Sequence, residues 1–365
     1  MKTELTLDEA EKIVEKLKFC QDNPHLCQCV GCPIYEEPFE EKLIKLTDDM
    51  PREEYHSRRK FYKSVLHWGQ RKLLINELLF LTRYSKPGMF VLYVGSAPGT
   101  HLKILFELFP RLKWILVDPR KFEVKVSSKI RLINDFFDDG MAEKYASKGD
   151  KMLFISDIRT GDIQDVMRDA ERESEQARAN LKLDELVDKD MILQMGWYKI
   201  MKPAAAMLKF RLPYMSKEED EITYLDGEVW IQPWVGPSST ETRLVVTEDK
   251  VRKWKPNLYE DQMFYHNTVT RVSCWTHSVK APGIDNCYDC NYEIFVLGEY
   301  LEKYEKWLKS KDERSKRISK MIQWISRIIG GKNESLQIKT EISSKKYKDA
   351  LRTGNWGLLK KMEKE

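Results

Sequence analysis

Four ionisable side chains of this 365-residue chain have the types needed to move a proton, namely Lys72, Asp157, Lys209 and Glu241. A lysine acts as a general base only when its amine is neutral, so its pKa must fall from about 10.4. A neighbouring cation lowers that pKa, whereas carboxylates raise it and orient the ammonium. The set therefore fits removal of a proton from a hydroxyl. Taken singly, each of the four also fits an ordinary solvated surface charge.

A glycine loop is the second candidate feature. The stretch 91–100 reads Val-Leu-Tyr-Val-Gly-Ser-Ala-Pro-Gly-Thr, and a helical pattern begins at Leu102. Glycines at 95 and 99 let a ligand approach the main chain, and the first N–H groups of the helix face a polar group. The loop is neither G-x-G-x-x-G nor a P-loop, so a nucleoside without a pyrophosphate fits better than phosphate binding. A tight strand-to-helix turn of any α/β protein is the alternative.

The elements that must position these residues alternate between strand and helix. Strands are expected at 91–94, 114–117, 130–133, 152–156, 204–208, 228–231, 242–246 and 292–296. Helices are expected at 5–19, 58–84, 162–190, 191–201 and 318–329. This order predicts an α/β fold with a doubly wound, mostly parallel sheet and antiparallel strands at one edge.

The carboxyl ends of the parallel strands are where such sheets bind ligands. Gly95, Asp118, Asp157 and Lys209 all fall at expected strand ends. Asp118 follows the second strand, so its carboxylate is placed to accept hydrogen bonds from ribose hydroxyls. We therefore expect one site to form along this edge.

Composition predicts an intracellular, cytoplasmic protein with an uneven charge. No apolar run reaches the roughly 18 residues that span a bilayer, and the N-terminus has no signal-peptide core, so no membrane is expected. Residues 301–365 hold 18 Lys or Arg and 9 Asp or Glu; subtracting this +9 from the total of +4 leaves −5 for the first 300 residues. The basic tail suggests an arm that binds nucleic acid or a partner, or simply a solvated Lys-rich helix.

The seven cysteines are clustered. In a reducing compartment, tight spacing favours zinc over disulfides, so a structural zinc at Cys20, Cys27, Cys29 and Cys32 is one hypothesis. Their spacing is not a common finger pattern, however. The Cys-x-x-Cys at 287–290 also fits a hairpin.

Six blocks of sequence carry a family resemblance, in order and in spacing. They are Gly69–Leu74, Tyr93–His101, Lys113–Asp118, Ile155–Arg159, Leu208–Arg211 and Glu241–Leu244. Together they closely resemble the poxvirus-type cap-specific mRNA (nucleoside-2′-O-)-methyltransferases, a family that also serves as the small regulatory subunit of the viral poly(A) polymerase. The similarity runs from about residue 65 to residue 300.

The resemblance implies a Rossmann-like methyltransferase that uses S-adenosylmethionine and methylates the 2′-OH of the first transcribed nucleotide of capped mRNA. The implied catalytic residues are Lys72, Asp157, Lys209 and Glu241, with Lys209 central. The implied cofactor contacts are Gln70, Tyr93, Gly95, Ala97, Gly99, Asp118, Arg120, Phe136, Phe137 and Asp157.

The cap guanine is a planar cation that stacks between aromatic rings and pairs with carboxylates. By resemblance, its contacts are Arg211, Tyr214, Glu241 and Glu260, with Tyr55 as the second aromatic wall. Where the family has an acid two residues after the position of Tyr214, this chain has Ser216.

The same resemblance divides the chain into a Cys-rich N-terminal extension (1–55), a methyltransferase domain (56–300) and a basic helical C-terminal extension (301–365). Partners would be the capped 5′ end of mRNA and a poly(A) polymerase catalytic subunit or an RNA polymerase, with packaging in a large DNA virus particle as an option. The alternatives are methylation of ribosomal RNA and a non-catalytic, RNA-binding subunit of a poly(A) polymerase.

Overall fold

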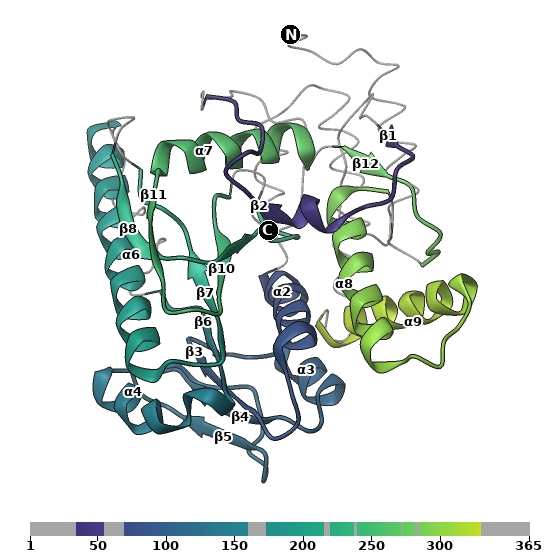
Figure 1. The fold of residues 1–365 in the computed structure, drawn as a ribbon, viewed down its shortest axis with the longest axis horizontal. Coiled ribbons are helices and arrows are strands. Elements are labelled where there is room, and N and C mark those ends of the chain that lie inside the picture. The colour runs from purple at the N-terminus through teal and green to yellow at the C-terminus, as the bar shows by residue number, and fades with distance from the viewer. Residues whose placement is uncertain are drawn as a thin grey trace.

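An eight-stranded mixed sheet organises the chain, with helices on both faces (Figure 1). The computed structural model describes residues 34–54, 69–159, 173–214, 220–236, 239–271, 273–281, 284 and 286–329. In the helix that begins at residue 173, side chains are described from residue 184 onward. Outside these ranges lie the expected helix 5–19, the start of the helix expected at 58–84, Tyr55, Ser216 and Cys20 to Cys32.

The strand order is β2-β9-β10-β7-β6-β3-β4-β5. Strands β7, β6, β3, β4 and β5 run parallel, whereas β10, β9 and β2 are antiparallel at one edge. This arrangement confirms the predicted α/β class. The strands are β2 (Lys45–Leu46), β3 (Phe90–Val94), β4 (Lys113–Val117), β5 (Ile130–Ile133), β6 (Met152–Ser156), β7 (Ala205–Phe210), β9 (Glu228–Trp230) and β10 (Thr242–Val246).

Two short sheets flank the main one. They pair β1 (Ile34–Tyr35) with β12 (Cys274–Trp275), and β8 (Ile222–Leu225) with β11 (Val251–Trp254). One core lies between the sheet and the helices α2 (Gly69–Tyr84), α3 (Leu102–Leu108), α8 (Tyr288–Tyr304) and α9 (Lys311–Ile329). The other face carries α4 (Asp139–Tyr145), α6 (Glu173–Met201) and α7 (Pro256–Tyr265). The shorter helical turns are η1 (Glu41–Ile44), η2 (Ala146–Lys151) and η3 (His266–Thr270).

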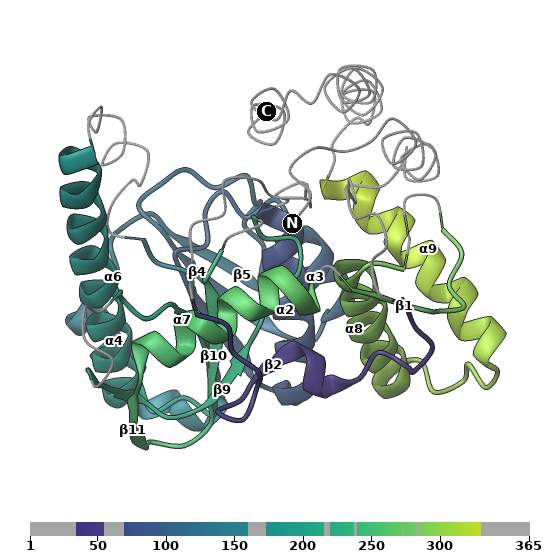
Figure 2. The same cartoon turned by 90° about the horizontal axis from the view of Figure 1, so that it is seen from above.

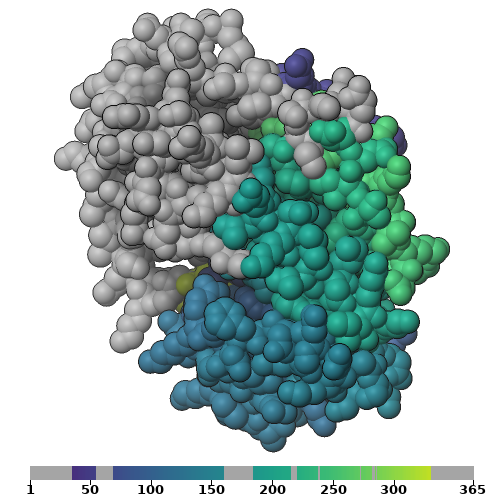
Figure 3. Space-filling model, turned by 90° about the vertical axis from the view of Figure 1, so that its left-hand side faces the viewer, coloured from purple at the N-terminus to yellow at the C-terminus, as the bar shows by residue number. Residues whose placement is uncertain are grey.

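Figure 2 shows the same two layers from above, with α6 and α4 on one side of the sheet and α2, α3, α8 and α9 on the other. Figure 3 presents the flank formed by the chain around α4 (blue) and α6 (teal). None of the helices in the described ranges is long and apolar enough to cross a membrane.

One predicted strand is wrong, because residues 292–296 belong to helix α8. The run Tyr-Glu-Ile-Phe-Val has strand propensity, but Val296, Tyr300 and their neighbours bury one face at helical spacing. Cys287 caps the helix, because its Sγ accepts a hydrogen bond from the Cys290 N–H at 3.5 Å. The two helices predicted at 162–190 and 191–201 are also joined, since one continuous helix runs from residue 173 to residue 201.

Candidate active site

The alternation of side chains along three strands gathers the charged residues. In β6, β7 and β10, Ile155, Met207 and Val245 belong to the core that faces α2. Successive residues of a strand point to opposite faces, so every second residue returns to the same one. Asp157, Lys209 and Arg243 therefore lie on the α2 side, near the carboxyl ends of β6 and β7. Strand β10 is antiparallel to β7, which brings its first residues to that same edge.

The four predicted residues form one ion-pair network. Lys72 Nζ, from the first turn of α2, lies 2.6 Å from Glu241 Oε1. Lys209 Nζ lies 3.0 Å from Asp157 Oδ1 and 3.3 Å from Glu241 Oε2. The two lysines thus share the carboxylate of Glu241, and of these two lysines only Lys209 also contacts Asp157.

Sequence reasoning missed three residues that complete this network. Arg243 donates to Asp157 Oδ1 at 2.8 Å and lies 3.4 Å from Glu241 Oε1. Arg159 Nη2 lies 3.3 Å from Glu241 Oε2, and Gln232 Nε2 donates to Glu241 Oε1 at 3.1 Å. The sequence does hold a signal for Arg243, because it stands two residues after Glu241 and shares the face of Val245.

Burial and charge set the protonation of this cluster. Burial lowers the pKa of Lys72, although the negative charge of Glu241 acts to raise it. Burial alone would raise the pKa of Asp157, but Lys209 and Arg243 bring it down to about 2. Burial opposes ionisation of Glu241 as well, and the nearby lysines hold its pKa well below the ordinary value. Both carboxylates are therefore ionised at neutral pH and fix the orientation of the lysines.

The glycine loop packs directly on this cluster. Gly95 has φ +80°, and a Cβ there would come within 2.7 Å of the carbonyl carbon and oxygen of Asp157. Gly99 has φ +72°, and a Cβ there would meet a Leu102 methyl at 2.9 Å. Only glycine combines this main-chain conformation with such close approach. The loop therefore packs directly against the main chain of Asp157, with no room for a side chain between them.

A buried polar network lies under the loop. Gln70 Oε1 lies 2.6 Å from Thr100 Oγ1 and 2.7 Å from His101 Nδ1. His101 Nε2 lies 2.9 Å from Glu77, which also accepts the Tyr93 hydroxyl at 2.6 Å. The Tyr93 side chain is thus fully buried under the loop, and Gln70 links α2 to the loop.

Asp118 and Arg120 lie beside Ala97 at the rim. Asp118 Oδ2 accepts the Ala97 N–H at 2.9 Å, and Oδ1 accepts the Arg120 N–H at 2.9 Å. The Arg120 guanidinium also contacts both carboxylate oxygens at 3.0 Å, although this side chain is 68% exposed. The Asp118 carboxylate itself is buried beneath these contacts, with 2% of its side chain exposed.

The neighbouring residues Phe136 and Phe137, both predicted as cofactor contacts, differ in exposure. Phe136 is 74% exposed at the end of the loop after β5. Phe137 is buried in the core against Trp197, with ring centres 4.9 Å apart. Phe136 is thus the one free to cover a ligand.

Two of the predicted cap contacts, Tyr214 and Glu260, lie near Arg211. Its guanidinium lies 4.8 Å from the ring centre of Tyr214 and 3.0 Å from Asp184. Tyr214 is 46% exposed. Burial raises the pKa of the half-buried Glu260 carboxyl, with Asp261 adding to the rise and Arg211 opposing it. The exposed ring of Tyr214 therefore already carries one planar cation.

No metal centre is found in the described ranges, where no three His, Cys, Asp or Glu side chains gather to hold an ion. The cysteines of the zinc hypothesis lie outside those ranges, and Cys287 acts as a helix cap. Zinc thus has no structural support.

The fold and the site together define an α/β protein with a tight glycine loop beside a lysine and carboxylate cluster. A model of the poly A polymerase regulatory subunit family matches residues 39–328, so the chain belongs to that family.

Two viral relatives match about half of the chain, and both are named cap-specific mRNA (nucleoside-2′-O-)-methyltransferase. That of fowlpox virus (strain NVSL) is 32% identical over 224 residues, which are 56% of this chain and 68% of the relative. That of myxoma virus (strain Lausanne) is 28% identical over 228 residues, 57% of this chain and 63% of the relative, less than two thirds of its length. A ribosomal RNA methyltransferase from Plasmodium falciparum is 15% identical with a TM-score of 0.28, covering 49% of this chain and 95% of that one, which is too weak to carry an argument.

Proposed function

We propose that this chain is a cap-specific mRNA 2′-O-methyltransferase, which transfers a methyl group from S-adenosylmethionine to the ribose 2′-OH of the first transcribed nucleotide. The observation that carries the proposal is the network of Lys72, Asp157, Lys209 and Glu241 beside the glycine loop. The names of the fowlpox and myxoma relatives agree with this chemistry.

The residues present fit the methyl donor. Gly95 and Gly99 adopt the positive φ values that turn the loop tightly against Asp157, and the Asp118 carboxylate at the end of β4 would accept hydrogen bonds from ribose hydroxyls. Gln70, Ala97, Arg120 and the exposed Phe136 would complete the pocket, and S-adenosylmethionine supplies a methyl group on a sulfonium when bound. Tyr93 and Phe137 would act through their main chain and packing, because their side chains are buried.

Lys209 would face the 2′-OH. Its ammonium has three N–H donors. Asp157 and Glu241 each accept one of them, which leaves the third for the hydroxyl. When its amine is neutral, the same nitrogen accepts the hydroxyl proton. Lys72 and Arg243 would compensate the two carboxylates and keep them in place.

The substrate pocket would use Tyr214 and Glu260. The planar guanidinium of Arg211 lies over the Tyr214 ring. This contact supports the proposal that the ring also binds a planar cation such as N7-methylguanine. The carboxyl of Glu260, on α7, would then accept hydrogen bonds from the edge of the base, as would Glu241 from nearby ribose. Tyr55 is proposed as the second wall.

The test is transfer of a labelled methyl group to matched capped and uncapped short RNAs, followed by nuclease mapping of the labelled ribose. We expect label only on the first nucleotide of capped RNA. Lys209→Ala should lower kcat at least about a hundredfold, as loss of a general acid–base residue does. Lys199→Ala, which removes an exposed lysine of α6, is the matched control. Equal labelling of both RNAs would contradict the cap-specific activity.

The family description favours one further function, assistance to a poly(A) polymerase catalytic subunit. That role predicts longer poly(A) tails when this chain is added to such a subunit, with Lys209→Ala as effective as the wild type. Tails of unchanged length would argue against it.

A further inference from the structure

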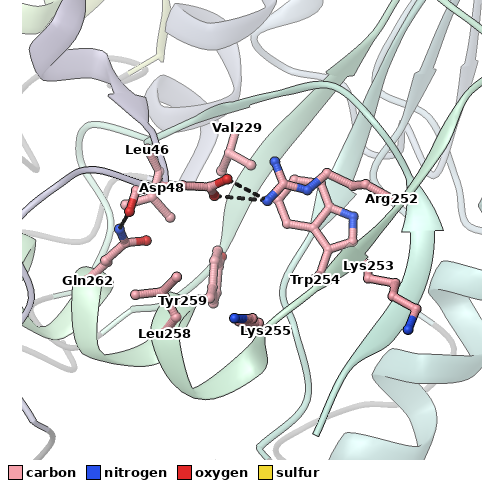
Figure 4. A pocket seen from close by; sticks show the side chains of 10 residues that line it. All are labelled: Leu46, Asp48, Val229, Arg252, Lys253, Trp254, Lys255, Leu258, Tyr259 and Gln262. Carbon is pink, nitrogen blue, oxygen red and sulfur yellow. Dashed lines mark hydrogen bonds and ion pairs between the residues drawn. The ribbon is translucent and has the colours of Figure 1, made fainter. Parts of the chain in front are cut away.

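A pocket of about 300 Å³ lies apart from the catalytic cluster, between β2, β9, β11 and α7 (Figure 4). Leu258, Tyr259 and Gln262 line it from α7. Successive helix residues are about 100° apart, so Glu260 lies on the opposite flank of the helix from Leu258 and Gln262. The pocket is therefore distinct from the surface around Tyr214 and Glu260.

One wall is a stack of two flat groups. The Arg252 guanidinium lies 4.1 Å from the centre of the Trp254 indole ring, and Figure 4 shows the two overlapping. Arg252 Nη2 donates to both carboxylate oxygens of Asp48 at 2.9 Å. The guanidinium is thus held flat by the indole and by the carboxylate. Arginine planes held in this way are surfaces on which nucleobases stack.

The charge of the pocket is positive. Arg252, Lys253 and Lys255 line it against a single lining carboxylate, that of Asp48. Lys253 follows Arg252 on β11, so its side chain points to the opposite face of the strand, where it pairs with Glu221 at 2.9 Å (Figure 4). Lys255 is exposed at the start of α7. An exposed cation next to a flat stacking surface suits a ligand with a planar part and an anionic part.

The pocket is rigidly built. Gln262 Nε2 donates to the carbonyl oxygens of Thr47, Asp48 and Met50 at 2.9 to 3.3 Å, which fixes the turn after β2. The Tyr259 hydroxyl donates to the Thr240 carbonyl at 2.5 Å and lies 2.9 Å from Thr242 Oγ1, so this wall bonds to both neighbours of Glu241. The ligand surface is therefore formed before binding and is fastened to the active site.

We propose that this pocket binds one nucleotide of single-stranded RNA, with the base on the Arg252 guanidinium and the phosphate at Lys255. The volume lies at the small end of the range for ligand pockets, which suits a single nucleotide. The choice of RNA rests on the proposed function. An acidic peptide would use the lysines but not the stacked guanidinium.

The test measures binding of a fluorescent, uncapped oligouridylate by anisotropy over a series of salt concentrations, with no cap and no methyl donor present. Arg252→Ala and Lys255→Ala should each raise Kd several-fold. Each phosphate interaction that a variant removes should reduce the slope of log K against log salt by about 0.7. Lys250→Ala is the matched control, because this exposed lysine of the β10–β11 turn pairs with Glu248 outside the pocket. It should leave Kd within about twofold.

A second variant separates stacking from charge. Arg252→Lys keeps the positive charge but removes the plane, so Kd should rise while the salt slope stays nearly unchanged. Oligouridylate binding by Arg252→Ala and Lys255→Ala equal to that of the control would overturn the inference. So would equal displacement of the oligouridylate by polyglutamate of matched charge. If the wild type transfers no methyl group yet the pocket variants lose RNA binding, the proposed function fails and the pocket inference stands.

Discussion

Glu241 is the residue on which the charges of the site converge. Its carboxylate contacts Lys72, Lys209, Arg159 and Arg243, whereas Asp157 contacts Lys209 and Arg243. Such an arrangement is stable only while both carboxylates are ionised, because a protonated acid would leave buried cations uncompensated.

Acid should therefore weaken the fold through Asp157. Its folded pKa of about 2 lies below the unfolded value of about 4, so its stabilising contribution is complete above pH 4 and lost as pH falls through 2. The difference is worth about 2 kcal/mol. Urea unfolding of wild type and Asp157→Asn should show a stability gap that narrows from pH 5 to pH 2. Asp150→Asn, at an exposed residue, serves as the control. A gap independent of pH would contradict the assignment.

At this scale, strand ends located from apolar runs predicted that Asp157 and Lys209 lie at one edge, and the family resemblance joined Lys72 and Glu241 to them. The buried partners could not be found in the same way. Glu77 and His101 hold Tyr93 and the glycine loop from beneath, and each appears in the sequence only as a polar residue within an apolar helix or after a loop. Their pairing depends on the packing of α2 against β3.

Among the elements, helix α8 fixes the parts that carry the site. Glu293 receives two hydrogen bonds from Arg71, at 2.6 and 2.7 Å, and both residues are fully buried. Arg71 precedes Lys72 on α2. Asp289 pairs with Arg271, whose guanidinium also donates to the carbonyls of Val235 and Gly236 in the loop that leads to Glu241. Helix α8 thus supports from behind the segments that carry Lys72 and Glu241.

Glu293→Gln should therefore be strongly destabilising. Removing one partner of a buried ion pair leaves an uncompensated charge and costs about 3–5 kcal/mol. Urea denaturation measures the loss, and the double variant Arg71→Met with Glu293→Leu should recover much of it, because an apolar pair needs no compensation. Glu302→Gln, at an exposed position of the same helix, is the control. A loss below about 1 kcal/mol in Glu293→Gln would refute the role given to this pair.

Strand propensity misled the prediction for α8, and the reason is physical. The first six residues of α8, Tyr288–Glu293, are all buried, so this part of the helix shows no apolar stripe, and the aromatic and β-branched run that follows looks like a buried strand. Strands β3 to β7 were predictable because each is a short apolar run bounded by turns. The two-residue strands β1, β2 and β12 are too short to leave a pattern, and they form only through pairing with distant segments.

On the scale of the whole molecule, α9 belongs to the core on the α2 side of the sheet. Ile318, Met321, Ile322 and Ile325 are buried in the same cluster as α2 and α8 residues. The division of the chain at residue 300 stays a prediction, but these contacts favour a single folding unit through residue 329.

Ile322→Ala should accordingly destabilise the whole fold by about 2–4 kcal/mol in one transition. Tryptophan fluorescence and circular dichroism should report the same midpoint urea concentration. The substitution should lower this midpoint equally for both probes. Lys320→Ala, exposed on the same helix, should leave the midpoint in place. Two separated transitions, with only the minor one affected by Ile322→Ala, would show instead that the C-terminal region folds apart from the sheet.

The close approach between Gly95 and the main chain of Asp157 has a consequence for how such a protein can change over time. The loop at 95 belongs to the proposed donor pocket, and Asp157 to the proposed acceptor chemistry, yet no atom fits between them. A side chain at position 95, or a shift of the main chain at 157, would therefore disturb both parts of the site together. Changes in substrate preference are therefore expected in the outer segments around Tyr214 and α7. The contact between Gly95 and the main chain of Asp157 is expected to stay the same.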